Sequence, residues 1–149
     1  MNPLPYRFPV LSWINISALI DLRSTLQRES YELLEIDDGN IEDADSFFQA
    51  IRDTLPLDPP LSGVVNWDAF CDSVWGGLYE LGEPRVAIMW TRVERMFAHG
   101  LPDLLAVVNC FRDVAIGVNN PNYGPIIELH VFLLGEGDNF KRLEAFADI

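Results

Sequence analysis

Apolar and polar positions along the chain follow two periods. Short apolar runs at residues 31–36, 85–90 and 126–134 indicate strands, and the second and third are continuously apolar, as buried parallel strands are. Other segments repeat their apolar residues at helical spacing. The helices expected from this spacing are residues 43–54, 66–77, 92–98, 103–118 and 139–147. The order β-α-α-β-α-α-β predicts an α/β fold with a three-stranded parallel sheet. Right-handed crossovers in one direction place the helices mainly on one face, in a two-layer arrangement.

Residues 1–30 precede this pattern as an N-terminal extension. Three prolines within the first nine residues predict irregular structure or an edge strand, because proline cannot donate to a central ladder. Residues 17–28 predict a helix with Ser17 as its N-cap. Its expected apolar side chains are Leu19, Ile20, Leu22 and Leu26. Since the second and third strands are apolar on both sides, we expect the extension and the C-terminal helix to cover the second face. The whole chain, residues 1–149, is then one domain.

The helix of residues 66–77 has the most informative polar pattern. Asn66 is a favourable N-cap, because its side-chain oxygen accepts a hydrogen bond from a free N–H of the first turn. Asp68, Asp72 and Trp75 fall on one stripe, at i, i+4 and i+7. Like charges at i, i+4 destabilise a helix by a few tenths of a kcal/mol. A solvated acidic face is the simplest interpretation of the two aspartates alone.

The segment N-W-D-A-F-C-D of this helix resembles the helix motif of the barstar family, small intracellular inhibitors of secreted microbial ribonucleases. The order of elements over about residues 31–134 is similar to that family as well. The resemblance implies a barstar-like fold in which Asp68 and Asp72 enter a nuclease active site and meet its cationic residues. Through the local motif F-R-D, which ends at Asp113, it also implies that Asp113 contacts the enzyme.

Around the helix, the chain departs from the family pattern. Residues 59–65 contain no aromatic side chain, whereas the corresponding loop of many family members is aromatic and contacts the enzyme. The family often has glycine and then an aromatic residue after the helix, but here Trp75 precedes Gly76 and Gly77. We expect this glycine pair to end the helix through a left-handed cap, and residues 61–65 to give the contact surface its shape. Such a mixture is typical of an inhibitor of a different nuclease, including an immunity protein against a secreted toxin.

Negative charge is concentrated around the predicted acidic helix. The 149-residue chain has 23 acidic and 10 basic residues, a formal net charge of −13. Residues 31–83 contain 13 of the acids and one arginine, a balance of −12, so the rest of the chain is nearly neutral. Nucleic-acid binding requires positive charge against the phosphates and is therefore disfavoured. A concentrated negative face attracts a cationic protein and speeds its encounter.

Metal and catalytic sites find little support in the sequence. No Cys/His spacing fits a zinc site, and no glycine-rich phosphate loop is present. Asp68 and Asp72 could act as an acid/base pair or as ligands of a divalent metal, but no third ligand is legible. We expect Cys71 and Cys110, both in apolar helical segments, to be buried thiols in a reducing compartment. The sequence predicts neither a signal peptide nor a membrane span, since it has no apolar run near 18 residues.

These observations favour a cytoplasmic, non-enzymatic inhibitor or immunity protein of a cationic nuclease or toxin, with no cofactor, no metal and no membrane partner. The residues expected to bind the partner are Asn66, Asp68, Asp72, Trp75, Gly76 and Asp113. Two alternatives stay open. One is a metal-dependent hydrolase that uses Asp68 and Asp72, and the other is a diverged acidic protein-interaction module.

Overall fold

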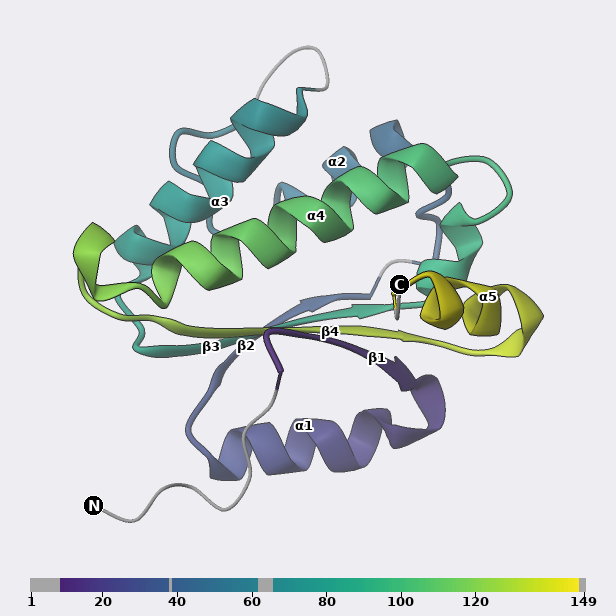
Figure 1. Cartoon of the computed structure of the whole chain (residues 1–149), viewed down its shortest axis with the longest axis horizontal. Helices are drawn as coiled ribbons and strands as arrows, with labels where there is room; N and C mark the ends of the chain where they lie inside the picture. Colours follow the sequence, from purple (N-terminus) through teal and green to yellow (C-terminus); the bar gives the residue numbers. More distant parts are fainter. Residues whose placement is uncertain (1–8, 38, 62–65, 148–149) are drawn as a thin grey trace.

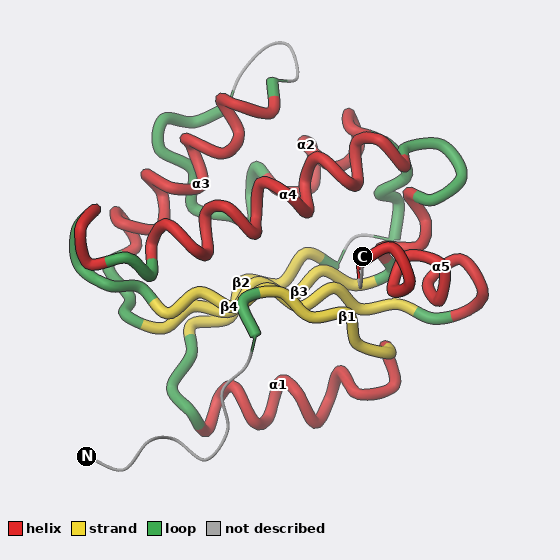
Figure 2. Tube along the Cα trace, viewed as in Figure 1, coloured by secondary structure: helices red, strands yellow, loops and turns green. Residues whose placement is uncertain are grey.

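Four parallel strands form the sheet of the protein, which is described from a computed structural model (Figure 1 and Figure 2). The structure describes residues 9–37, 39–61 and 66–147. Residues 146 and 147 are described through their backbone only. The strands are β1 (Leu11–Asn15), β2 (Glu32–Ile36), β3 (Arg85–Thr91) and β4 (Glu128–Gly135). Their order across the sheet is β1-β4-β3-β2, and each neighbouring pair is parallel. The α/β fold with a parallel sheet is confirmed. The prediction of three strands is wrong, because the extension supplies β1 as a fourth, edge strand.

Helices cover both faces of this sheet (Figure 1). One face is covered by α2 (Ala44–Ile51), α3 (Trp67–Leu81) and α4 (Leu101–Val118). The opposite face is covered by α1 (Leu19–Arg28). The helices of the described residues therefore lie mainly on one face, as predicted, but α1 makes a third layer that a two-layer arrangement lacks.

The remaining elements connect these layers. The helix α5 (Gly137–Ala147) follows β4 and packs against the 3-10 turn η2 (Val93–Met96). The turn η1 (Ile16–Ala18) precedes α1, and the turn η3 (Pro121–Tyr123) follows α4. Each of these two turns thus adjoins one end of a helix.

Each face of the sheet has its own apolar core, as the apolar sequences of β3 and β4 require. The core under α1 consists of Leu26, Tyr31, Ala87, Met89, Phe132 and Leu134. The extension therefore covers the second face, as expected. In contrast, Phe140 and Leu143 of α5 belong to the main core beneath α2, α3 and α4, where the Phe140 ring lies 6.2 Å from that of Trp13. The prediction that the C-terminal helix covers the second face is wrong.

The start of α1 also differs from the sequence prediction. The turn η1 begins with Asn15, whose Oδ1 accepts a hydrogen bond from the Ser17 backbone N–H at 2.9 Å. The helix then starts at Leu19 without a side-chain cap, so Ser17 is not its N-cap. Of the expected apolar side, Leu26 is fully buried and Leu19 and Leu22 pack against the core, whereas Ile20 is 73% exposed, so the prediction is wrong for Ile20 alone.

A capping box starts α2. The Asp43 carboxylate accepts a hydrogen bond from the Ser46 backbone N–H at 2.9 Å, and the Ser46 hydroxyl accepts one from the Asp43 N–H at 3.1 Å. The bond from the Ser46 N–H and a second one, which the Ser46 hydroxyl donates to the same carboxylate at 2.7 Å, hold the pKa of the Asp43 carboxyl below its usual value of 3.8. The backbone bond contributes most. The apolar residues whose helical spacing predicted a helix over residues 43–54 form its inward stripe, since Phe47, Phe48 and Ile51 are all buried.

Candidate functional site

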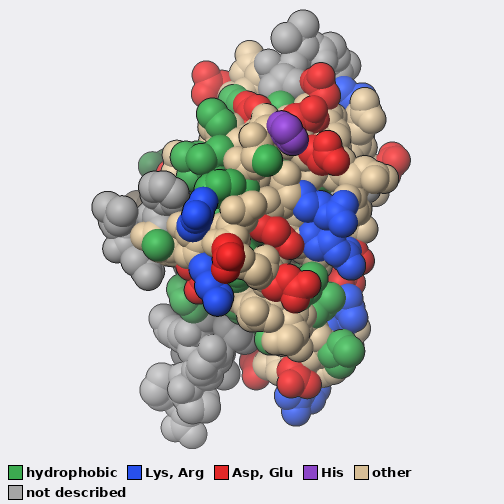
Figure 3. Space-filling view, turned by 90° about the vertical axis from the view of Figure 1, so that its right-hand side faces the viewer, with side chains coloured by type: hydrophobic (Ala, Val, Ile, Leu, Met, Phe, Trp, Pro, Cys, Tyr) green, Lys and Arg blue, Asp and Glu red, His purple; other side chains and the backbone are tan. Residues whose placement is uncertain are grey.

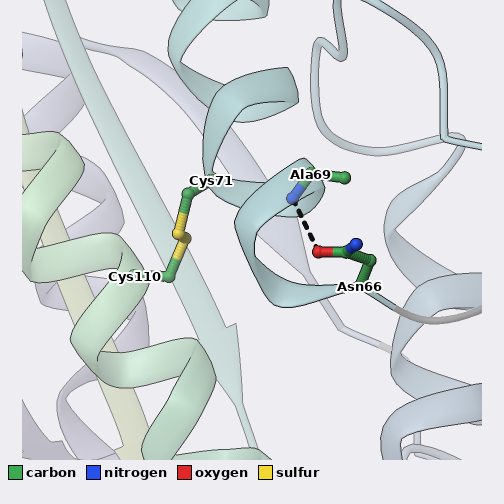
Figure 4. Close-up of a disulfide and its surroundings, with 4 residues drawn as sticks. All are labelled: Asn66, Ala69, Cys71 and Cys110. Atoms are coloured by element: carbon green, nitrogen blue, oxygen red, sulfur yellow. Dashed lines mark hydrogen bonds between the residues drawn. A yellow bond between two sulfur atoms is a disulfide. The ribbon is translucent and has the colours of Figure 1, made fainter.

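The acidic helix α3 starts where the sequence places it. Asn66 has extended backbone angles, and its side-chain Oδ1 accepts a hydrogen bond from the Ala69 N–H at 3.1 Å (Figure 4). This cap satisfies one of the free N–H groups of the first turn. The buried side of the helix carries Phe70 and Val74, at 0% and 1% exposure. Cap and core together fix which residues of α3 face the solvent.

Asp68 and Asp72 are both exposed on that solvent-facing side. The ion pairs of the described residues use other acidic side chains, and neither aspartate has a hydrogen-bond partner among those residues. Side chains at i, i+4 of a helix lie about 5–6 Å apart at Cβ. The two carboxylates therefore form a fixed pair of like charges, without a cation to neutralise them within the described part of the chain.

A disulfide ties α3 to α4 beside this pair. Cys71 and Cys110 are bonded, with their Cα atoms 5.6 Å apart (Figure 4). The prediction of two free thiols is wrong, and the expectation of a reducing compartment loses its basis in these cysteines. The reason is tertiary: two small side chains face each other where the helices touch, and a sequence separation of 39 residues gives no sign of that.

The same bond locates Asp113 relative to α3. Asp113 is exposed and lies three residues after Cys110, which is nearly one helical turn. On α3, Asp68 and Asp72 lie three residues before and one residue after Cys71. Exposed carboxylates of both helices therefore lie within about one helical turn of the disulfide. The sequence could not show this grouping, because it depends on how the two helices pack.

Gly76 and Gly77 do not end α3, so that prediction is wrong. The helix continues to Leu81, and Gly82, with φ 73° and ψ 12°, is its left-handed C-cap. A Cβ atom at Gly76 would overlap the Asp58 carbonyl oxygen, and one at Gly77 would overlap the Pro56 carbonyl. The glycine pair thus allows the preceding loop to cross the helix in close contact.

Ser73 attaches this loop to α3. Its hydroxyl donates to the Pro59 carbonyl at 2.7 Å, and its backbone carbonyl accepts from the Asp58 N–H at 3.0 Å. Ser73 is 1% exposed, so both bonds are shielded from water. The predicted contribution of residues 61–65 to the surface falls largely on residues 62–65, which lie outside the described residues.

Trp75 is half-buried where α3 meets α4, against the backbone of Gly117, where a Cβ atom would overlap its six-membered ring. Its ring meets that of Tyr123 edge to face at 5.9 Å and lies 6.2 Å from that of Tyr79. The sequence placed Trp75 on the acidic stripe but missed both tyrosines. Helical spacing could have indicated Tyr79, at i+4 from Trp75, whereas Tyr123 is brought in only by the turn after α4.

Basic side chains are scarce on these two helices. α3 has none, and the single arginine of α4, Arg112, donates to Asn109 at 3.3 Å. Arg112 also lines a separate hollow of about 360 Å³, together with Trp13 and Glu144. Figure 3 shows a different side of the molecule, where blue and red side chains are interspersed. The helices α3 and α4 therefore carry more acidic than basic side chains.

Metal sites and membrane spans would each need a particular arrangement of side chains. In the described ranges, no group of three or more histidine, cysteine or acidic side chains is arranged to hold a metal ion. Within the same ranges, none of the helices has both the length and the apolar character that spanning a membrane would need.

The fold and the exposed aspartates of α3 together define an α/β protein that presents an acidic helix above a parallel sheet. A family model described as Barstar (barnase inhibitor) matches residues 31–130. The chain therefore belongs to the barstar family, which confirms the resemblance drawn from the sequence. The match includes β2, α2, α3, β3 and α4, whereas β1, α1 and α5 lie outside it. No curated protein and no solved structure matches the chain.

Proposed function

We propose that this protein inhibits a cationic ribonuclease by filling its active site with the acidic side of α3. The observation that carries the proposal is the pair Asp68 and Asp72, exposed and unneutralised among the described residues, in a chain of the barnase-inhibitor family. Carboxylates carry negative charge where a ribonuclease expects phosphate. They accept charge-assisted hydrogen bonds from Arg, Lys or His⁺ of the enzyme but offer no bond that it can cleave.

Rigid placement of these carboxylates favours tight binding. The Asn66 cap fixes the start of the helix before the partner arrives, and the disulfide, when it is formed, ties the helix to α4, so little conformational freedom is lost on association. Asp113 supplies a third carboxylate from α4, and Trp75 supplies an apolar edge. Gly76 contributes shape, because it lets the preceding loop lie flat on the helix.

The proposed role is binding without catalysis, by an inhibitor or an immunity protein. We place it in the cytoplasm, where the RNA of the cell needs protection from the nuclease. Reducing conditions there open disulfides, so binding has to be measured with the Cys71–Cys110 bond both formed and reduced.

The test uses barnase and a panel of other basic secreted microbial ribonucleases as probes. We expect stoichiometric inhibition of at least one of them, and no RNA or phosphate-ester hydrolysis by the protein itself. Asp68→Ala and Asp72→Ala should each weaken binding by orders of magnitude. Their melting temperatures should stay unchanged or rise slightly, since a like-charge repulsion is relieved.

Asp21→Ala is the matched control, because it removes an exposed carboxylate from α1, on the opposite face of the sheet. This variant should inhibit as the natural chain does. Failure to bind any ribonuclease of the panel would count against the proposal. Equal inhibition by the Asp72→Ala and Asp21→Ala variants would also count against it. If Asp68→Ala and Asp72→Ala lost fold stability but bound the ribonuclease as before, the role of Asp68 and Asp72 would be structural.

A further inference from the structure

The solvent-facing stripe of α3 continues beyond the acidic pair. Trp75 and Tyr79 follow Asp72 at i+3 and i+7, so the stripe changes from acidic to aromatic along the helix. From Asp68 to Tyr79 the stripe is about 16 Å long at 1.5 Å per residue. It leads to a crevice of about 220 Å³ at the C-terminal end of the helix. The residues that line this crevice are Tyr79, Gly82, Glu83, Pro84, Pro125, Ile126 and Ile127.

Walls of two chemical kinds form the crevice. Prolines and isoleucines make most of it apolar, and Ile126 remains 50% exposed at the surface. Two polar groups complete it, the carboxylate of Glu83 and the hydroxyl of Tyr79. The Tyr79 hydroxyl is buried and has no hydrogen-bond partner within the described ranges. A buried polar group without a partner is unfavourable, so a ligand that supplies one gains affinity.

Gly124 lies against the Tyr79 phenol, next to Pro125 of the crevice. Its φ of +144° is a conformation that residues with a side chain rarely adopt, and a Cβ atom there would lie 3.4 Å from the Tyr79 hydroxyl oxygen. Among the lining residues the charged one is Glu83, and none is basic. The nearby Arg85 is already paired with Glu29 and Glu128.

We propose that the crevice binds an arginine side chain of the cationic partner, as a second anchor beyond Asp68 and Asp72; this rests on the proposed function. The three methylenes of arginine lie along apolar walls while its charged head stays polar. Its guanidinium has five N–H donors, enough to reach both the Glu83 carboxylate and the Tyr79 oxygen. A purely apolar side chain would leave that hydroxyl unpaired and would remove water from Glu83 without compensation.

Spacing along α3 defines where the arginine lies on the partner. Tyr79 is seven residues after Asp72, a rise of about 10 Å on the same side of the helix. The partner therefore has to present an arginine about 10 Å from the cationic centre that meets Asp72. The ring of Trp75 lies between the two anchors and packs against Gly117.

The first experiment tests the crevice without a nuclease. The probes are N-acetyl-arginine amide, the citrulline analogue as a neutral isostere, and the norleucine analogue as an apolar stem. NMR titration of the full chain should give saturable shifts of the Tyr79, Gly124 and Ile126 signals with arginine and several-fold weaker binding with the other two. Tyr79→Phe and Glu83→Gln should each weaken arginine binding by roughly threefold, as for partly exposed charge pairs.

Glu80→Gln is the matched control, because it removes the same charge from a residue next to Tyr79 that lines a different hollow, with Pro56 and Leu57. It should leave the titration unchanged. Equal binding of the norleucine analogue would make the crevice an apolar pocket and overturn the proposal. Equal weakening by Glu80→Gln and Glu83→Gln would also overturn it, since the attraction would then be diffuse.

The second experiment uses any ribonuclease that the panel identifies. Glu83→Gln and Tyr79→Phe should raise its dissociation rate several-fold. If Asp72→Ala weakens the complex and these two variants do not, the arginine anchor is wrong and the proposed function stands. If no ribonuclease binds but the blocked arginine still occupies the crevice, the proposed function fails while the crevice keeps its ligand class.

Discussion

Reduction of the Cys71–Cys110 disulfide should lower the free energy of unfolding by about 4 kcal/mol. The bond joins residues separated by 39 positions, and the loop-closure relation for a ring of that size gives about 3.9 kcal/mol at 25 °C. Most of this effect acts on the unfolded chain, which gains freedom when the bond opens. The native helices keep their other contacts, including Trp75 against Gly117. Because domains of this size are stable by about 5–15 kcal/mol, the change is large but leaves a folded protein.

Urea unfolding followed by tryptophan fluorescence, with and without a phosphine reductant, measures this difference. The slope with urea should also rise on reduction, because the unfolded chain then exposes more surface. The double variant Cys71→Ala, Cys110→Ala is the control and should not respond to the reductant. Two titratable thiols in protein denatured without reductant, or equal stability in both states, would refute the reasoning.

Three further predictions concern the loop, the acid range and the kinetics. Gly77→Ala should lower the free energy of unfolding, measured in urea, by about 3 kcal/mol or more, because its Cβ meets the Pro56 carbonyl. A Gly→Ala change in a helix usually has the opposite effect and raises this free energy by roughly 1 kcal/mol. A more stable variant would mean that the loop does not lie on α3. The Asp43 pKa is lowered on folding, so its contribution is present above the unfolded value of 3.8 and is lost as pH falls through the folded pKa. The Asp43→Asn variant keeps a capping side chain that does not titrate. Between pH 5 and pH 3, the melting temperature of this variant should fall less than that of the natural chain. Parallel curves of melting temperature against pH would contradict this. Association with a basic ribonuclease should slow several-fold from 0.01 to 0.1 M salt, as the Debye length falls from about 30 to 10 Å, with dissociation nearly unchanged; a salt-independent on-rate in stopped-flow mixing would leave the acidic cluster without a steering role.

Local chemistry made part of this molecule predictable from its sequence. Asn66 indicated the start of α3 through its own side chain, and the apolar periodicity indicated the stripe of α2 with Phe47 and Phe48. The edge strand near the prolines was also predictable, because proline excludes a central position. In each of these cases, the evidence lay within a few residues of the feature.

Features that depend on distant contacts were missed or misread. Gly76-Gly77 has the composition of a helix end, but the glycines are required by a loop that crosses the helix, and composition does not separate the two. The pairing of Cys71 with Cys110 and the arrival of Tyr123 beside Trp75 depend on how α3 and α4 pack. The position of α5 could not be read from its amphipathic pattern, because both faces of the sheet offered an apolar surface.

The neighbouring positions of β1 and β4 determine how the chain can fold as it leaves the ribosome. Leu11 pairs with Val131, about 120 residues later, so β1 is made first but has no partner until β4 emerges. At 5–20 residues per second this wait lasts roughly 6–24 s. During that time α1 lacks Phe132 and Leu134, two of the side chains that its apolar side covers. The nascent N-terminal segment must therefore stay exposed, or be held by a chaperone, until the last strand is synthesised.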